Sequence, residues 1–521
     1  MSDPATPSPP TYWLTRFAIL RLLGFVYLMA FLVAARQSAP LFGHDGLTPA
    51  DLFLDRLVEQ AGSRAGAFFR LPTVFLLIGV SDGALATVAW IGVALSALAV
   101  AGFSNAILMA LLWAHYMSIV HVGQIWYGYG WEIQLLETGF LAIFLCPLLD
   151  PRPLPRRPPP VAVLWLFRWL AFRIMLGAGL IKIRGDACWR DLTCLTTHYE
   201  TQPIPNPLSR ALHFMPVWFH KAGVLFNHLV ELVAPWLAFW PRIARHVAGT
   251  LMVAFQIILI ISGNLSFLNW LTIVPALACF DDSLLRRIVP GFLARRAERA
   301  AGEWAAGAGP ANAAAAGPSH LQFTTSMALV AVVAFLSIGP VLNLVSSRQA
   351  MNTSFDRLHL VNTYGAFGSV GRQRPELVFE GTSDDTITPG TEWKEYEFYC
   401  KPGDPRRRPC QISPYHYRLD WQIWFAAMAG PDRYPWTVHF AWKLLHGDPG
   451  ALGLLADNPF PDAPPRSVRV VRYIYEFARP DDPEGRWWIR SDPHDWLPPL
   501  RADDPRLRRF LASYGWIGRD R

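Results

Sequence analysis

Ionisable side chains inside the long apolar stretches of this sequence could do chemistry, and six of them are the main candidates: Glu132, Glu137, Arg173, Lys182, His228 and Glu231. An ionisable group in the hydrocarbon core of a membrane is costly, so it usually faces the interior of a helix bundle and has a partner there. Helices that rise about 1.5 Å per residue and alternate in direction place Lys182 level with Glu132, and Arg173 near mid-membrane, level with Glu231. We therefore predict an intramembrane polar network in which Arg173 pairs with Glu231 or Glu137, and Lys182 with Glu132. Such pairs either lock helices together or form a substrate site, and we favour the first role.

The polar stretch WRDLTCLTTHYETQPIPNPL, residues 189–208, holds further candidates for chemistry. His198 and Glu200 are potential metal ligands, but a zinc site needs at least three protein ligands and no matching third residue is evident. We therefore expect no metal and no other cofactor, and we interpret the stretch as an amphipathic segment on the outer membrane surface. The sequence also lacks a nucleotide-binding loop, a serine-nucleophile elbow and an H-E-x-x-H pair.

A third candidate is the aromatic segment PYHYRLDWQIWF, residues 414–425. Its alternation of aromatic and polar residues is typical of a half-buried β-strand. If they were exposed, Tyr415, Tyr417, Trp421 and Trp424 would form a recognition surface for a client protein, because Trp and Tyr dominate binding hot spots. We favour a place in the core.

Composition indicates what positions these residues. The chain has 521 residues, of which 52% are hydrophobic and only 17% are charged, with 22 Trp and 32 Phe, and its mean hydropathy is +0.22. These proportions exclude a disordered protein and an ordinary cytosolic enzyme, and they indicate a polytopic membrane protein. The net charge of +7 does not indicate a nucleic-acid partner, because many arginines lie in short loops between apolar runs rather than on one basic face.

We predict about nine membrane-spanning helices, each from an apolar run of about 20 residues. They lie near residues 15–36, 82–101, 104–122, 130–148, 161–183, 218–240, 245–262, 265–280 and 323–345. The arginine-rich loops then fall on the same side as the N-terminus, and the positive-inside rule makes that side cytoplasmic. The last span delivers the rest of the chain to the exoplasmic side.

The expected fold is thus a polytopic α-helical membrane bundle with a C-terminal soluble, β-rich α+β domain on the exoplasmic side. Its predicted parts are a multi-span helical domain (1–280), a cytoplasmic linker that is basic and then rich in Ala and Gly (281–322), a final transmembrane helix (323–345) and the soluble domain (346–521). We predict that the low-complexity stretch 300–318 is disordered. In the soluble domain we expect strands at 376–380, 393–399, 417–425 and 469–477, and helices at 436–446, 451–456 and near 504–513.

This topology sorts the six cysteines. Four lie on the exoplasmic side, where disulfides persist, and two lie at the inner ends of spans, where we expect free thiols. Cys400 and Cys410 flank the turn KPGDPRRRP, and we predict a disulfide between them, worth about 2–3 kcal/mol by chain entropy. Cys188 and Cys194 can bond only if the residues between them are not helical. Their pairing stays open, and they lack the C-x-x-C spacing of a redox-active pair.

Several stretches resemble the lipase maturation factor family: YGWEIQLLETGFLAIFL (129–145), WRDLTCLTTHYETQPIPNPLS (189–209), GNLSFLNWLTIVPALACFDD (263–282) and CKPGDPRRRPCQISPYHYRLDWQIWFAAM (400–428). The resemblance covers residues 12–516. It implies a multi-span protein of the endoplasmic reticulum membrane that assists the folding and assembly of secreted lipases, with the C-terminal domain engaging the client in the lumen. The composition is rich in Ala, Arg and Pro, which is typical of a bacterial protein. In a bacterium the equivalent location is the cytoplasmic membrane, with the C-terminal domain in the periplasm, and the client need not be a lipase.

Three hypotheses about function follow. We favour a membrane-bound, non-catalytic maturation factor, whose partners are membrane lipid and an exported client such as a lipase. Alternatively, the stretch GAGLIKIRGDACWRD, residues 177–191, is similar to the lysine-containing span of vitamin K-dependent carboxylases. That similarity implies a membrane enzyme with Lys182 as the base acting on a bound quinol. The third hypothesis is thiol–disulfide exchange through Cys188 and Cys194.

Overall fold

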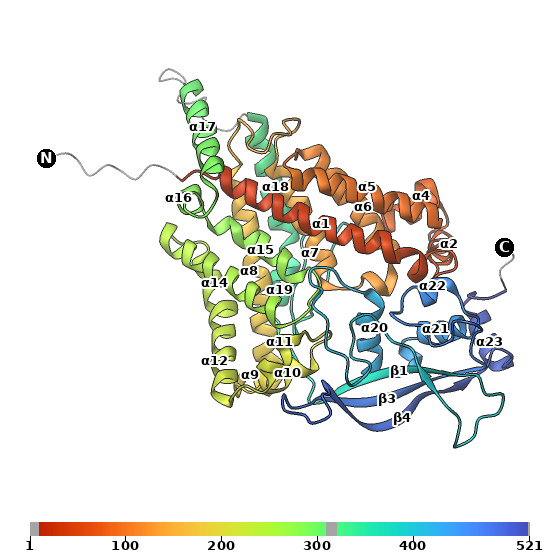
Figure 1. Ribbon diagram of the computed structural model, residues 1–521. Coiled ribbons are helices and arrows are strands. Elements are labelled where there is room, and N and C mark those ends of the chain that lie inside the picture. The colour runs from red at the N-terminus through yellow and green to blue at the C-terminus, as the bar shows by residue number, and fades with distance from the viewer. Residues whose placement is uncertain (1–9, 309–319, 519–521) are drawn as a thin grey trace.

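Long helices occupy one end of the molecule and an antiparallel sheet occupies the other, with short helices between them (Figure 1). The computed structural model describes residues 10–308 and 320–518. Helices cover most of the first 308 residues: α1 (Trp13–Phe42), α2 (Ala50–Ala61), α3 (Arg64–Arg70), α4 (Phe75–Ile78), α5 (Asp82–Ala101), α6 (Ala106–Val122), α7 (Gly130–Leu145), α8 (Val161–Arg184), α9 (Ala187–Arg190), α10 (Leu195–Thr201), α11 (Pro207–His213), α12 (Val217–His228), α13 (Ala234–Leu237), α14 (Arg242–Ser262), α15 (Leu268–Ala276), α16 (Asp282–Leu285) and α17 (Gly291–Ala308). Two 3-10 turns, η1 (Gln124–Tyr127) and η3 (Leu277–Cys279), and one π-helical turn, η2 (Leu229–Val233), join these helices, and α18 (His320–Leu336) and α19 (Ile338–Val345) follow.

Among the described residues, five helical segments are long and apolar enough to cross a membrane. They are Trp13–Phe42, Asp82–Ala101, Val161–Arg184, Arg242–Ser262 and Gln322–Val345. Large apolar side chains point outward from several of these segments, among them Trp90 on α5, Ile243 on α14 and Phe335 on α18, each at least 48% exposed. Outward apolar surface of this extent on long helices is what lipid contact requires. The chain is an integral membrane protein.

The other predicted spans also coincide with helices, but these helices are shorter. The apolar helices Ala106–Val122 and Leu268–Cys279 have fewer than 18 residues, and the span predicted at 218–240 is divided into α12, η2 and α13. Pro235 lies in this divided segment, at the first turn of α13, and has no backbone N–H to donate.

The predicted disordered linker is wrong for residues 300–308, which complete α17. Leu293, Ala297 and Trp304 lie at helical spacing and pack on a cluster that includes Trp13 and Phe280, so the helix has an apolar face to bury. Residues 309–318 of that prediction lie outside the described residues.

The C-terminal part contains a four-stranded sheet in the order β2-β1-β3-β4, and the three pairings are antiparallel. Its elements are β1 (Arg374–Thr382), β2 (Lys394–Glu395), α20 (Arg418–Ala427), the 3-10 turn η5 (Pro431–Arg433), α21 (Trp436–Leu445), α22 (Pro449–Leu452), β3 (Ser467–Phe477), β4 (Trp488–Leu500) and α23 (Pro505–Ser513). In Figure 1, α20 and α21 lie between the sheet and the long helices, and Phe379 of β1 meets Phe440 of α21 with ring centroids 5.2 Å apart. The sheet is therefore the layer farthest from the helical bundle.

Three element predictions in this part need correction. The stretch 417–425 forms helix α20 rather than a strand; Leu419, Ile423 and Ala426 are buried at helical spacing, and such a short apolar run fits either period. The strand expected at 393–399 is reduced to the two residues of β2. Strand β4 was not predicted at all, because Pro493 and two further prolines within it break the usual strand pattern and are tolerated only on an edge strand.

One hydrophobic cluster runs without interruption from α1 to α23, so the two parts share a core. Residues 346–373, between α19 and β1, contain no helix or strand apart from one isolated bridge, and they run against α8. At Gly177 of α8, a Cβ atom would overlap the carbonyl oxygen of Tyr364. A glycine is required there because backbone meets backbone.

We predict that Gly177→Ala lowers the apparent melting temperature of the detergent-solubilised protein by several degrees, since the overlap can be relieved only by shifting the chain and overpacking costs about 1–3 kcal/mol. The matched control is Gly302→Ala in α17, where an added Cβ meets nothing within 4 Å and the helix gains propensity. Equal melting temperatures for the two variants, measured by intrinsic fluorescence, would contradict the close packing of residues 346–373 on α8.

Candidate functional site

A buried ion pair joins the two parts of the chain. The guanidinium of Arg418, at the start of α20, donates from Nη1 to Glu132 Oε1 in the first turn of α7 at 2.7 Å, and both side chains are 0% exposed. The same nitrogen donates to the carbonyl of Trp126 at 2.6 Å, and the guanidinium lies 3.5 Å from the ring centroid of Tyr127. Glu132 also accepts hydrogen bonds from Trp131 and Tyr116. These contacts offset part of the desolvation cost of both charges, which is the condition for burying an ion pair.

A second buried pair holds the segment that precedes the sheet. Arg173 of α8 binds the carboxylate of Glu137 on α7 and donates to the carbonyl of Asn362 at 2.7 Å. Glu137 Oε2 in turn accepts from the backbone N–H of Asn362 at 2.9 Å and from the hydroxyl of Tyr364 at 2.7 Å. Non-helical backbone is thus anchored between two apolar helices, with its polar groups satisfied by the charged pair.

The third pair lies at the end of α8 that leads into the 185–216 loop. Lys182 donates to Glu231 Oε1 at 2.5 Å and to Asn227 Oδ1 at 3.2 Å, while Asn227 donates to Glu231 Oε2 at 2.9 Å. The ammonium also lies 5.1 Å from the ring centroid of Trp189. Glu231 sits in the π-helical turn η2, and with its partners it forms a closed set in which both charged side chains are at most 5% exposed.

Every residue of the predicted network is therefore close to a partner, but the pairing differs in part. Arg173 takes Glu137, one of its two predicted alternatives. The Lys182–Glu132 pair was wrong: Glu132 binds Arg418 of the C-terminal part, which leaves Lys182 for Glu231. His228 joins no charge and donates from Nε2 to the carbonyl of Trp189 at 3.0 Å.

The sheet is tied to the helical part by a further buried arginine. Arg374, the first residue of β1, binds Glu376 at 2.6 Å and donates to the carbonyls of Glu200 at 2.9 Å and Pro203 at 2.8 Å. Lys401 approaches the other oxygen of Glu376 at 3.3 Å. The 189–208 stretch, which we interpreted as a layer on the membrane surface, thus supplies carbonyl acceptors to the sheet.

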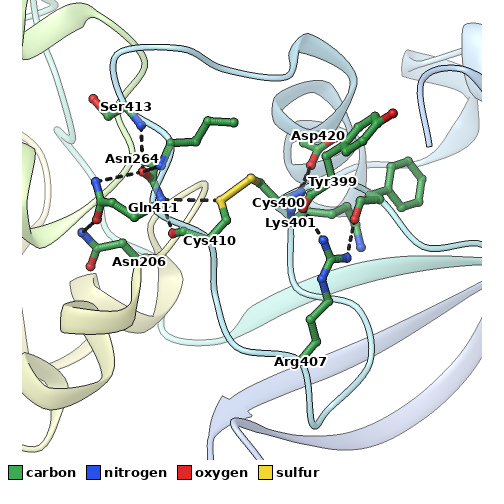
Figure 2. The surroundings of a disulfide bond; sticks show 12 residues. Asn206, Asn264, Tyr399, Cys400, Lys401, Arg407, Cys410, Gln411, Ser413 and Asp420 are labelled. Carbon is green, nitrogen blue, oxygen red and sulfur yellow. Dashed lines mark hydrogen bonds between the residues drawn. A yellow bond between two sulfur atoms is a disulfide. The ribbon is translucent and has the colours of Figure 1, made fainter. Parts of the chain in front are cut away.

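The disulfide Cys400–Cys410 closes a loop that touches both parts of the chain (Figure 2). On the helical side, Asn264 donates to the carbonyl of Cys410 at 2.9 Å and accepts from the backbone N–H groups of Ile412 and Ser413 at 2.9 and 3.1 Å. On the sheet side, the backbone N–H groups at the start of β4 donate hydrogen bonds to the carbonyl of Pro405. The guanidinium of Arg407 donates to the two backbone carbonyls that precede Cys400. We call residues 400–413 the disulfide clasp.

Asp420 of α20 stabilises one end of the disulfide clasp. Its Oδ2 accepts from the backbone N–H groups of Cys400 at 2.6 Å and Lys401 at 2.9 Å. Burial raises the pKa of Asp420 to about 6, despite these two hydrogen bonds and the nearby positive charges, which lower it.

The second cysteine pair is also bonded. Cys188 and Cys194 form a disulfide across the short turn between α9 and α10, and the two remaining cysteines, Cys146 and Cys279, are buried free thiols. His198 and Glu200 do not converge on a common point: His198 packs on Phe367, and Glu200 accepts the backbone N–H of Phe477 at 2.7 Å.

The four aromatic residues considered as a client surface make contacts inside the protein. Trp421 is 4% exposed and packs on Trp131, with ring centroids 4.8 Å apart. Tyr415 accepts a hydrogen bond from Gln37, Tyr417 stacks on Tyr399, and Trp424 donates to the carbonyl of Thr201. Trp421 is thus part of the core, as we favoured, whereas Tyr415, Tyr417 and Trp424 are only partly buried, and their role as a client surface stays a hypothesis.

Two family models match the chain. The lipase maturation factor transmembrane domain matches residues 14–287, and the lipase maturation factor C-terminal domain matches residues 360–498. The chain belongs to the lipase maturation factor family. Both sides of the buried interface thus fall inside the matched regions, with Glu132 in the first and Arg418 in the second.

The matching relatives cover most or nearly all of the chain. Lipase maturation factor 1 of Bos taurus is 51% identical over 98% of this chain and 93% of its own length, and the Homo sapiens protein of the same name is 47% identical over 99% and 95%. Lipase maturation factor 2 of Mus musculus is 30% identical over 74% of this chain and 68% of its own length. No solved structure shows significant similarity to the chain.

Sequence reasoning missed the residues that reach the network from the C-terminal part. Arg418, Asn362 and Arg374 were not candidates, because a single arginine or asparagine in a soluble segment carries no signal of burial. One signal was available: Arg418 lies among aromatic residues in 414–425, and an arginine within an apolar patch needs a buried acidic partner. The arrangement attaches the C-terminal, sheet-containing part of the chain to the helical bundle through buried polar contacts.

We predict that Arg418→Met lowers the free energy of unfolding of this protein by about 3–5 kcal/mol, because it leaves the buried Glu132 carboxylate without its cation. Arg418→Met combined with Glu132→Leu is expected to recover part of that loss, since no uncompensated charge then remains. The control is Arg152→Ala, which removes a surface ion pair with Asp150, and such exposed pairs contribute little to stability. Thermal unfolding and limited proteolysis rank the stabilities of these variants. If the double variant lost as much stability as the two single variants added together, the pairing would be refuted.

The raised pKa of Asp420 gives a second prediction. The pKa of Asp420 is near 6 in the folded state and about 4 in the unfolded state, so the folded state binds the proton more tightly. The resulting stabilisation is complete below pH 4 and is lost as the pH rises through about 6. It contributes up to about 3 kcal/mol to the free energy of unfolding. Asp420→Asn keeps an acceptor oxygen and cannot ionise. Its melting temperature relative to the wild type is therefore expected to rise between pH 4.5 and pH 7.5. A constant difference across that range would show that Asp420 titrates normally.

Proposed function

We propose that this chain is a membrane-bound, non-catalytic maturation factor that assists the folding and assembly of secreted lipases. The observation that carries the proposal is 51% identity, over 98% of the chain, to a protein named lipase maturation factor 1. Similarity at this level over both matched domains supports conservation of the whole architecture rather than of one shared module.

The proposal includes a location and a topology. The N-terminus faces the cytoplasm, about nine spans follow, and the C-terminal domain faces the lumen of the endoplasmic reticulum, or the periplasm if the host is a bacterium. Two disulfides, Cys188–Cys194 and Cys400–Cys410, support this orientation, because disulfides persist in oxidising compartments. The basic loops support it independently through the positive-inside rule.

The geometry suggests how such a factor works. The sheet is the layer farthest from the helical bundle (Figure 1). The buried pair Glu132–Arg418 and the hydrogen bonds from Arg374 to the carbonyls of Glu200 and Pro203 attach the C-terminal part to the helical part. A client bound to this domain would be held at a defined distance from the membrane. Binding to a rigid surface avoids the ordering cost that a mobile domain would pay.

The contacts of Lys182 favour a structural role over the base of a quinol-dependent enzyme. Its ammonium is held by Glu231 and Asn227, and its side chain is 5% exposed. A general base must reach the proton that it abstracts from the substrate, whereas this ammonium is buried and donates to two acceptors inside the protein.

The function is tested in cells that lack their own lipase maturation factor and secrete a reporter lipase. Expression of this chain is expected to raise the ratio of lipase activity to lipase mass in the medium towards the ratio obtained with the bovine relative. The double variant Lys182→Met and Glu231→Gln, which removes both charges together, is expected to retain this effect. An unchanged ratio for the wild type refutes the proposal; loss of the effect in the well-expressed double variant supports the enzyme hypothesis instead.

The topology has its own test. Asp384→Asn creates the glycosylation acceptor Asn-Asp-Thr at residues 384–386, in an exposed loop of the C-terminal domain. In mammalian cells this variant is expected to gain a glycan beyond any carried by the wild type, seen as an extra mobility shift that peptide N-glycosidase removes. The control adds Thr386→Ala, which destroys the acceptor. Absence of the extra shift would place the domain in the cytosol.

A further inference from the structure

A shallow hollow lies on the outer side of α14, near its first turn. Its volume is about 320 Å³, and it is lined by Ile243, His246, Val247, Thr250, Leu251 and Leu284. That volume is at the lower end of the range of ligand pockets, about 300–1,000 Å³. Four of the six side chains are purely aliphatic, so the hollow suits a hydrocarbon chain.

Cationic side chains converge at the same end of the helix. Arg242, Arg245 and His246 approach the Asp281 carboxylate at 3.0, 2.9 and 3.4 Å. Two guanidinium groups and one imidazole thus gather around this carboxylate. The neighbouring Asp282 is turned away and accepts the backbone N–H groups of Trp13 and Leu14.

Further positive charge lies beyond α16. Arg286 and Arg287 follow Leu284 of the hollow, and both are exposed. Arg286 has one acidic neighbour, Glu298, at 4.0 Å. The surroundings of the hollow are therefore basic on the side where α14 begins and apolar along the helix.

The hollow faces the region that lipid occupies. Helix α14 is long and apolar enough to span a membrane, and Ile243 and Val247, on the rim of the hollow, are 80% and 45% exposed. Arginines at the end of a span lie at the level of lipid headgroups, where they attract anionic lipids. An acyl chain in the hollow would run parallel to the helix, with its headgroup at Arg242.

We propose that this hollow binds one anionic glycerophospholipid. An acyl chain lies against Val247 and Leu251, and the phosphate lies near Arg242 and His246. The gathered basic side chains favour an anionic lipid over a zwitterionic one, because only the anionic lipid carries a net negative charge. The bound lipid would hold α14 to α16 and to the loop that caps α1. The site lies at the opposite end of α14 from the disulfide clasp and is independent of the proposed lipase function.

The experiment uses the full chain in detergent, with dioleoylphosphatidylserine or dioleoylphosphatidylcholine added, and native mass spectrometry as the readout. Phosphatidylserine is expected to give a one-to-one adduct that survives activation, whereas phosphatidylcholine is not. Arg242→Gln is expected to weaken phosphatidylserine binding roughly tenfold, as loss of a charge-assisted contact does. Val247→Trp, which fills the hollow, is expected to abolish the adduct.

The matched control is Ile261→Trp, an equally bulky change on the exposed surface at the other end of α14, and it is expected to leave binding unchanged. The head group alone, glycerophosphoserine, is expected not to bind, which separates a lipid site from an anion site. Equal adducts with both lipids, or wild-type binding by Val247→Trp, would overturn the proposal. Loss of binding in Ile261→Trp as well would also overturn it, because the lipid would then be general annular lipid.

Discussion

Charge buried where the helical bundle meets the C-terminal domain is the constraint on which the rest of the structure depends. Glu132 and Glu137 lie on one helix, α7, and each is compensated by an arginine and by groups from the C-terminal part of the chain. Burying either carboxylate in an apolar interior without those partners would carry a large desolvation penalty. The folded bundle therefore depends on contacts that residues 362–418 supply.

This dependence explains the course of the chain between the bundle and the sheet. Residues 346–373 have no helix or strand of their own, and they are held by Arg173, Glu137 and the close approach at Gly177. The disulfide clasp then joins Asn264 of the helical part to the first residues of β4. The shared hydrophobic core follows from these contacts, because paired charges bring the apolar faces of α20 and α7 together.

Such an arrangement fits a protein that works by binding. Lys182, Asn227 and Glu231 form a closed set of buried partners, and a fully satisfied polar network rigidifies the surrounding structure. On the proposed function, the rigid junction keeps the outermost layer, the sheet, at a fixed height above the membrane. A lipid bound in the hollow on α14 would stabilise the opposite end of the same helical bundle.

Composition and local pattern alone determined the class of this protein: the apolar runs, the change in character after residue 345, the cysteines flanking a turn, and strands such as 469–477 all follow from short-range periodicity. The identity of the polar residues in the bundle was also evident, because a charge within an apolar run is visible in one dimension. Their partners were not. Glu132 could be assigned to Lys182 by depth, but a partner 286 residues away, Arg418, is decided only when α20 packs on α7. The same packing turned an aromatic stretch that fits a strand into a helix, because a short apolar segment takes the period of the surface against which it is buried.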